Sequence, residues 1–82
     1  MATLLFFGRL ADTFGTGQTV TDLPEDVTDT ARLRTWLDTT HELAGTLLEP
    51  TIRIAVNDEI VAEPAPLNNG DIIAFLPPVG GG

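Results

Sequence analysis

The chain has 82 residues, 43% of them hydrophobic, and twelve acidic against four basic residues give it a formal net charge of −8. This length allows one domain with one core, and the hydrophobic content excludes wholesale disorder. The negative charge argues against nucleic-acid binding, and no apolar run is long enough for a membrane span, so neither kind of partner is expected. Cysteine is absent, which excludes disulfides and thiolate chemistry and fits a reducing compartment such as the cytoplasm.

The first predicted element is an apolar strand over residues 3–7. It carries no basic residues at its start, so no signal peptide is expected. Because polar and apolar residues do not alternate in it, both faces of the strand should meet apolar surroundings. Gly8 ends this run, and Leu10 and Phe14, spaced i and i+4, predict one or two helical turns after it.

A second strand is predicted over residues 18–23, with Val20 and Leu23 as its inward side chains. The two strand runs with a short connection between them are typical of a hairpin-like unit. Pro24 ends the unit.

A helix is predicted over residues 29–39, with Thr28 or Asp29 as its N-cap. The residues expected on its buried face are Ala31, Leu33, Trp36 and Leu37, and those expected off that face are Arg32, Arg34 and Asp38. Trp36 is interpreted as a core residue, because aromatic side chains on a helix face usually pack. His41, the one histidine, is interpreted as a solvated or capping group near the helix end.

The second half of the chain predicts three more strands. Residues 42–48 fit either a helical turn or a loop, and residues 51–56 alternate as a strand. Residues 59–61 return as a short strand after a turn, which predicts a hairpin. Leu67 is a candidate core residue within a crossing loop, and the last strand covers residues 72–76. This order favours an α+β fold, a sheet packed on one main helix, with the apolar first and last strands side by side in its middle.

Catalytic and metal-binding sets are not found. The chain has no serine or cysteine, so a serine- or cysteine-based triad is impossible, and the carboxylates show no spacing that singles out an acid–base pair. Gly15–Gly17 lacks the lysine of a phosphate-binding loop, and no metal-ligand spacing is present. We therefore do not expect a stand-alone enzyme.

The end of the chain carries the strongest functional signal. The apolar last strand leads into Pro77 and Pro78, then Val79, and then three glycines up to Gly82. Proline ends strand pairing, and six extended residues reach about 20 Å. A thin tail of this kind can enter a channel that excludes larger side chains, and we interpret its terminal carboxylate as the reactive group. A frayed terminus without function is the alternative.

Apolar excess on the sheet is a second signal. Residues 3–7 and 72–76 are apolar on both faces, but one helix covers only one face of a sheet. The other face should then expose an apolar patch, which usually marks a protein interface. Periodicity alone does not decide which side chains face inward.

Three segments together resemble a known family. They are residues 4–10, residues 69–79 and the terminal Gly-Gly, and they are similar to the small subunit of molybdopterin synthase, a ubiquitin-like sulfur carrier family. The resemblance covers essentially the whole chain. It implies a β-grasp domain over residues 1–76, with a mixed sheet of four to five strands on one helix, and a flexible tail over residues 77–82.

The resemblance also implies a chemistry. An E1-like adenylating enzyme would use ATP-Mg to activate the carboxylate of Gly82, next to Gly81, and a sulfurtransferase would supply the sulfur of a thiocarboxylate. Within a heterotetramer, the large subunit would accept the tail, and sulfur would pass to cyclic pyranopterin monophosphate. The carrier itself would bind no cofactor and would be a non-catalytic sulfur donor, with the catalytic groups in its partners.

Residue roles follow from the same resemblance. Phe7 and Leu76 would face the large subunit. The residues implied to form the core are Leu4, Phe6, Ile73 and Phe75 with Leu33 and Leu37, and those implied to line the threaded tail are Pro77, Pro78, Val79, Gly80 and Gly81. Gly80 departs from the small Ser, Thr or Ala that is frequent in the family at that position. Three other functions stay open: a sulfur carrier for thiazole synthesis or tRNA thiolation, a ubiquitin-like protein modifier, and a passive interaction domain.

Overall fold

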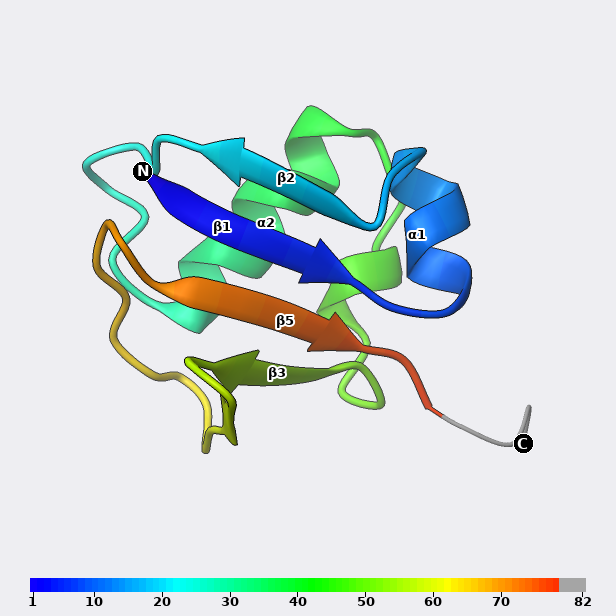
Figure 1. Ribbon diagram of the computed structural model, residues 1–82. Coiled ribbons are helices and arrows are strands. Elements are labelled where there is room, and N and C mark those ends of the chain that lie inside the picture. Colours follow the sequence, from blue (N-terminus) through cyan, green and yellow to red (C-terminus); the bar gives the residue numbers. More distant parts are fainter. Residues whose placement is uncertain (79–82) are drawn as a thin grey trace.

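The computed structural model describes residues 1–78. Its elements follow the predicted order, with short helices on either side of the main one (Figure 1). They are β1 (Ala2–Phe6), α1 (Arg9–Phe14), β2 (Gln18–Thr21), α2 (Thr30–Thr40), the 3₁₀ helix η1 (Thr46–Leu48), β3 (Arg53–Val56), β4 (Glu59–Ile60) and β5 (Ile72–Leu76).

The five strands form one mixed sheet in the order β2-β1-β5-β3-β4. β1 and β5 are parallel neighbours in the middle, in the register Leu4↔Ile73 and Phe6↔Phe75, and the other pairings are antiparallel. The predicted central position of the first and last strands is therefore confirmed. α2 crosses one face of the sheet (Figure 1), which gives the predicted α+β class and the β-grasp arrangement.

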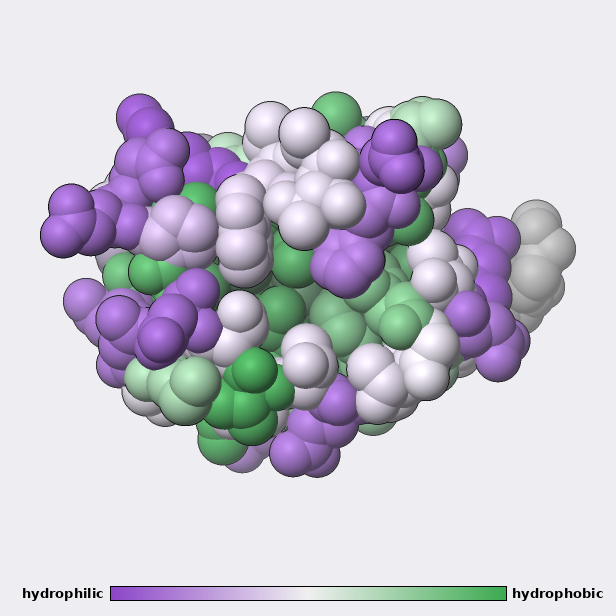
Figure 2. Space-filling model, turned by 90° about the horizontal axis from the view of Figure 1, so that it is seen from above, coloured by the Kyte–Doolittle hydropathy of each residue, from purple (hydrophilic) through white to green (hydrophobic). Residues whose placement is uncertain are grey.

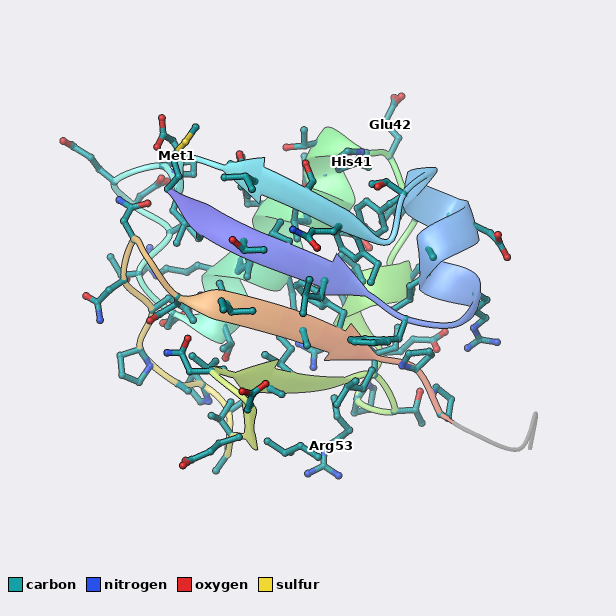
Figure 3. All side chains as sticks on the ribbon, viewed as in Figure 1. Met1, His41, Glu42 and Arg53 are labelled. Carbon is teal, nitrogen blue, oxygen red and sulfur yellow. The ribbon has the colours of Figure 1, made fainter. Side chains whose placement is uncertain are left out.

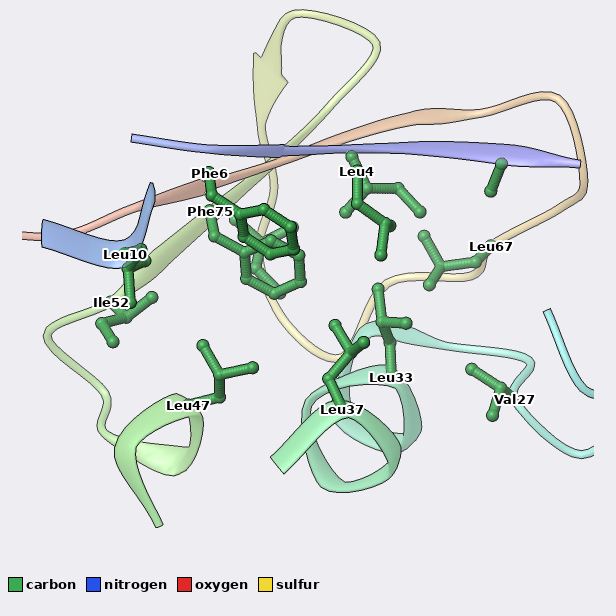
Figure 4. Close-up of a cluster of buried hydrophobic side chains, with 13 residues drawn as sticks. Leu4, Phe6, Leu10, Val27, Leu33, Leu37, Leu47, Ile52, Leu67 and Phe75 are labelled. Atoms are coloured by element: carbon green, nitrogen blue, oxygen red, sulfur yellow. The ribbon is translucent and has the colours of Figure 1, made fainter. Parts of the chain in front are cut away.

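The core lies between the sheet and α2 (Figure 4). The inward side chains of the two central strands are Leu4, Phe6, Ile73 and Phe75, all at most 3% exposed. Leu33 and Leu37 of α2 pack against them, and Leu67 closes the core from its loop as predicted. Each fully buried side chain of this size stabilises the fold by about 1.5–3 kcal/mol. Periodicity alone does not decide which alternate side chains of the two central strands face α2. The structure shows the arrangement that the resemblance implied.

The ends of α2 match their predictions. Asp29 is the N-cap and its Oδ1 accepts a hydrogen bond from the Arg32 backbone N–H at 2.8 Å. His41 is the exposed C-cap residue, and its backbone N–H donates to the Leu37 carbonyl. The helix runs one residue beyond the predicted end, to Thr40.

The predicted faces of α2 need correction. Arg34 and Asp38 were expected off the buried face, yet they are only 7% and 8% exposed. Ala31 was expected inside and is exposed, while Trp36 is partly buried at the margin of the core. The reason is that the buried stripe contains polar residues whose hydrogen bonds are satisfied by the chain that follows the helix.

Arg34 holds three separate segments together. Its Nη1 donates to the carbonyls of Leu47 at 2.7 Å and Glu49 at 3.2 Å, and its Nη2 donates to the carbonyl of Ile52. It also forms a two-pronged ion pair with Glu63, at 2.9 and 2.6 Å. Such a fork satisfies several buried carbonyls with one side chain, which explains why a guanidinium is buried here.

Asp38 orders the segment that the sequence left open between helix and loop. Its two carboxylate oxygens accept hydrogen bonds from the backbone N–H groups of Gly45 at 2.8 Å and Leu47 at 2.9 Å. Leu47, within η1, is thereby fully buried. This segment is a short 3₁₀ helix that closes one end of the core.

β2 is shorter than predicted, and its side chains face the opposite sides of the sheet from those predicted. It ends at Thr21, and Val20, predicted to face inward, is 51% exposed. The register Leu4↔Thr19 decides this, because the inward position of Leu4 on β1 sets the parity of its partner strand. Leu23 packs partly against the core, as predicted.

The β3–β4 hairpin is present but shorter at both ends than predicted. β3 begins at Arg53, because Ile52 lies in a turn in which its backbone N–H donates to the Glu49 carbonyl at 3.1 Å. Ile52 and Ile54 are nevertheless fully buried, whereas Val56 is partly buried. β4 ends at Ile60 rather than residue 61.

Candidate functional site

The face of the sheet opposite α2 is not covered by any element of residues 1–78 (Figure 3). β1 and β5 present apolar side chains on both faces, and those of the outer set are of intermediate burial or exposed. This outer patch consists of Leu5, Phe7, Ile72, Ala74 and Leu76. Phe7 is 47% exposed and Ile72 is 45% exposed, so the two ends of the patch are open. A contiguous apolar patch on a sheet is a feature of protein interfaces.

The tail begins at one end of this patch. The Phe7 backbone N–H still donates to the Phe75 carbonyl at 3.4 Å, so β1–β5 pairing continues to the end of the sheet. Pro77 follows and lies against Gly8, where an added Cβ would meet Pro77 Cγ at 3.2 Å. Gly8 also has a φ of +55°, which favours glycine. The root of the tail is therefore held beside Phe7 and Leu76.

Some of the predicted site residues lie together in the structure, and the others lie outside the residues that it describes. Phe7 and Leu76 share the outer face, and Pro77 and Pro78 leave the sheet next to them. Val79, Gly80, Gly81 and Gly82 lie outside the described residues, so their predicted roles stay predictions.

Arg53 adds a charge to this site that sequence reasoning left without a role. Arg53, on β3, pairs in register with Leu76 on β5, and its exposed side chain extends beyond the β3 side of the sheet (Figure 3). Strand alternation over residues 52–56 places it outward, but only the β3–β5 register places it beside Leu76. It is suited to meet a carboxylate of a partner.

Catalytic groups are not assembled in the described part of the chain. No group of three or more His, Cys, Asp or Glu side chains that could hold a metal is found in residues 1–78. His41 makes an edge contact with the Phe14 ring at 4.9 Å and lies at the end of α2, as expected for a capping residue. None of the helices among residues 1–78 has the length and apolar character to cross a membrane.

Within residues 1–78, the site therefore consists of an apolar sheet face and the root of the tail. Comparison with protein families gives one match, the ThiS family, over residues 4–82. The chain belongs to the ThiS family. No curated protein sequence matches it significantly.

Solved structures agree with the family and with its fold. Subunit 1 in the complex of subunits 1 and 2 of the molybdopterin-converting factor from Helicobacter pylori is 29% identical, with a TM-score of 0.66, over 99% of this chain and 97% of that one. SAMP1 from Haloferax volcanii is 24% identical with a TM-score of 0.77, over 99% and 98% of the two chains. The Haloferax volcanii HVO 2177 protein is also 24% identical, with a TM-score of 0.81, over 99% of this chain and 85% of that one.

These likenesses confirm the ubiquitin-like β-grasp fold. The family match agrees with the coarse form of the predicted function, which is membership of a family of ThiS-type sulfur carriers and ubiquitin-like modifiers.

Proposed function

We propose that this ThiS-family chain is the sulfur-donating small subunit of molybdopterin synthase. The observation that carries the proposal is the position of the tail root: Pro77 leaves the sheet beside the exposed Phe7 and the partly exposed Leu76. A partner that covers the outer patch would then lie where it can also receive the tail. The Helicobacter pylori relative, a subunit 1 held in a complex with subunit 2, supports a large subunit as that partner.

The proposed chemistry takes place at the carboxylate of Gly82. One of its oxygens attacks the α-phosphorus of ATP on the activating enzyme, which releases pyrophosphate and leaves an acyl-adenylate. A sulfur nucleophile at the oxidation level of sulfide then adds to the acyl carbon, and AMP departs with the original carboxylate oxygen. The product is a thiocarboxylate. AMP is needed because a free carboxylate has no good leaving group.

The carrier's own residues supply position rather than acid or base. The outer patch would dock on the large subunit by burying apolar side chains, and Arg53 would add a charged contact at the rim. The two prolines would restrict the root of the tail, so less ordering is needed when it enters the partner. In the large subunit, the thiocarboxylate sulfur would attack cyclic pyranopterin monophosphate, and water would then cleave the bond between the Gly82 acyl carbon and sulfur, which leaves the sulfur on the pterin and returns Gly82 to a carboxylate.

Reconstitution tests the pathway. The thiocarboxylated chain is mixed with a molybdopterin synthase large subunit and cyclic pyranopterin monophosphate, and dithiolene formation is measured. We expect product with the full chain and none when Gly81 and Gly82 are deleted. Leu48→Glu, at a residue that is 52% exposed in η1 and away from the outer patch, is the control and should retain activity.

Two outcomes would overturn this assignment. Absence of dithiolene from a fully loaded chain would leave the other sulfur-carrier functions, in thiazole synthesis or tRNA thiolation. A ladder of covalent conjugates on other proteins in cells would favour a modifier; such conjugates could not be chains of this protein on itself, because it has no lysine.

A further inference from the structure

A second surface, separate from the outer patch, lies between β2 and α2. Figure 2 shows it as a hollow with apolar atoms at its floor. Its volume is about 190 Å³. This is below the 300–1,000 Å³ that is usual for sites of drug-sized ligands, so it suits one or two side chains. We call it the β2 groove, and it is lined by Leu4, Phe6, Phe14, Thr19, Trp36 and His41, among others.

The groove exists because β2 faces the core with short side chains. The inward residues of β1 and β5 are leucine, isoleucine and phenylalanine, but the inward residues of β2 are Thr19 and Thr21. They do not fill the space up to α2, where Trp36 is only partly buried. The floor is rigid and apolar, because the Phe6 and Phe14 rings stack with their centroids 3.9 Å apart.

β2 is also an edge strand of the sheet, so alternate backbone groups along it point away from β1. The Phe6 N–H donates to the Gly17 carbonyl at 2.9 Å, and in an antiparallel pair the bonded positions alternate. Gln18 and Val20 therefore point their N–H and C=O away from β1. At Gln18 both of these backbone groups have a partner, because the Thr16 hydroxyl accepts a hydrogen bond from the Gln18 N–H at 3.3 Å and donates one to the Gln18 carbonyl at 2.9 Å. Among residues 1–78, Val20 has no such side-chain partner.

The charges around the groove select the partner. Asp22 follows β2 at one end and is 77% exposed in its side chain, with the N-terminal amine 3.9 Å away. Glu42 is exposed at the other end, next to His41 (Figure 3). On the α2 side, Arg32 pairs with Asp29 at 3.9 Å. With a net charge of −8, a second copy of this chain would be repelled, whereas a basic segment would be attracted.

We propose that β2 is a docking edge for an extended segment of another protein. In this segment apolar residues alternate, and lysine or arginine residues lie on both sides of them. The segment adds a strand beside Val20, inserts its apolar side chains into the β2 groove, and directs its basic residues to Asp22 and Glu42. Because β1 separates β2 from β5, this edge is distinct from the tail root and can be occupied while the tail is bound elsewhere.

A synthetic peptide with a Val-Thr-Val-Thr core, in which apolar and polar residues alternate, and two lysines at each end tests the proposal. Backbone amide shifts of the full chain are followed during titration, together with the Trp36 indole signal. We expect the largest shifts at Thr19, Val20 and Thr21. The same core with glutamates in place of the lysines should bind at least about tenfold more weakly.

Variants of Val20 separate the backbone contact from the side chain. Val20→Pro removes the free N–H, at an edge position where proline is tolerated, and should weaken binding about tenfold. Val20→Thr keeps the N–H and the β-branched shape, so it should bind like the wild type. Thr19→Ile leaves the backbone unchanged and fills the groove, and it should also weaken binding, so the test survives if Val20→Pro does not fold.

Three results would overturn the proposal: shifts concentrated on the outer patch, equal binding of the lysine and glutamate peptides, or unchanged affinity in Thr19→Ile. Deletion of Gly81 and Gly82 should leave peptide binding unchanged. Failure here is therefore distinguishable from failure of the sulfur-carrier function.

Discussion

The two faces of the central strands have similar residues and opposite surroundings. On the inner face, Phe6 and Phe75 are at most 3% exposed and pack under α2, whereas Phe7 on the outer face is 47% exposed. Both sets come from the same two strands, so local strand preference does not distinguish them. The difference teaches that the inner set stabilises the domain and the outer set is free to bind a partner. The predictions below test this division.

The largest expected effect is on the inner face. Phe75→Ala should lower the free energy of unfolding by about 3–5 kcal/mol, because it opens a cavity in a closely packed core. Phe7→Ala, its matched control on the outer face, should change stability by less than about 1 kcal/mol. Urea denaturation of both variants measures this, and equal losses would mean that the two faces are not different in function.

Arg34→Met tests the polar part of the buried helix face. It leaves the carbonyls of Leu47 and Ile52 and the carboxylate of Glu63 without their donor, so we expect a loss of about 2–3 kcal/mol in the same assay. Arg32→Met, at an exposed position of α2, is the control and should stay within about 0.5 kcal/mol of the wild type. A loss in Arg34→Met no greater than in this control would contradict the role given to Arg34.

Leu76→Glu tests the outer patch. The change places a charge in the outer patch beside the root of the tail, so binding of the large subunit should weaken at least about tenfold, measured by titration calorimetry. Stability should fall by no more than about 1 kcal/mol, because the side chain is already partly exposed. Leu48→Glu should leave binding unchanged, and comparable loss in both variants would refute the choice of face.

The smallest effect on stability is expected at the tail. Gly81→Ala should leave the thermal midpoint within error of the wild type, because this residue is predicted to lie outside the core. Its rate of sulfur loading by the activating enzyme should fall, since the added methyl group narrows the clearance in a channel that admits glycine. A large drop in the thermal midpoint would show that the tail belongs to the domain.

Most of the fold could be predicted because its signals are local. The apolar runs of the central strands, the Asp29 cap and the glycine and proline breaks each depend on neighbouring residues. The sequence also shows that both faces of these strands are apolar, whereas only the family resemblance places Phe7 and Leu76 on the exposed face. Those signals explain why the order of the elements agrees with the structure.

The errors arise where distant residues decide the outcome. Val20 faces outward because of its register with β1, which the pattern of residues 18–23 does not contain. The apolar pattern of α2 predicts a face through Ala31, Leu33, Trp36 and Leu37 that excludes Arg34 and Asp38. The residues that are buried instead form a single helical stripe: Thr30, Leu33, Arg34, Leu37 and Asp38. Their partners come from residues 45–63, so only the folded chain reveals why burial is tolerated.

The most direct test of the central claim is the intact mass of the chain after incubation with its activating enzyme, ATP-Mg and a sulfide source. We predict a mass gain equal to the replacement of one oxygen by one sulfur, located by fragmentation at Gly82 and absent when ATP is omitted. An unchanged mass, or the same gain in a chain that lacks Gly81 and Gly82, would contradict the account.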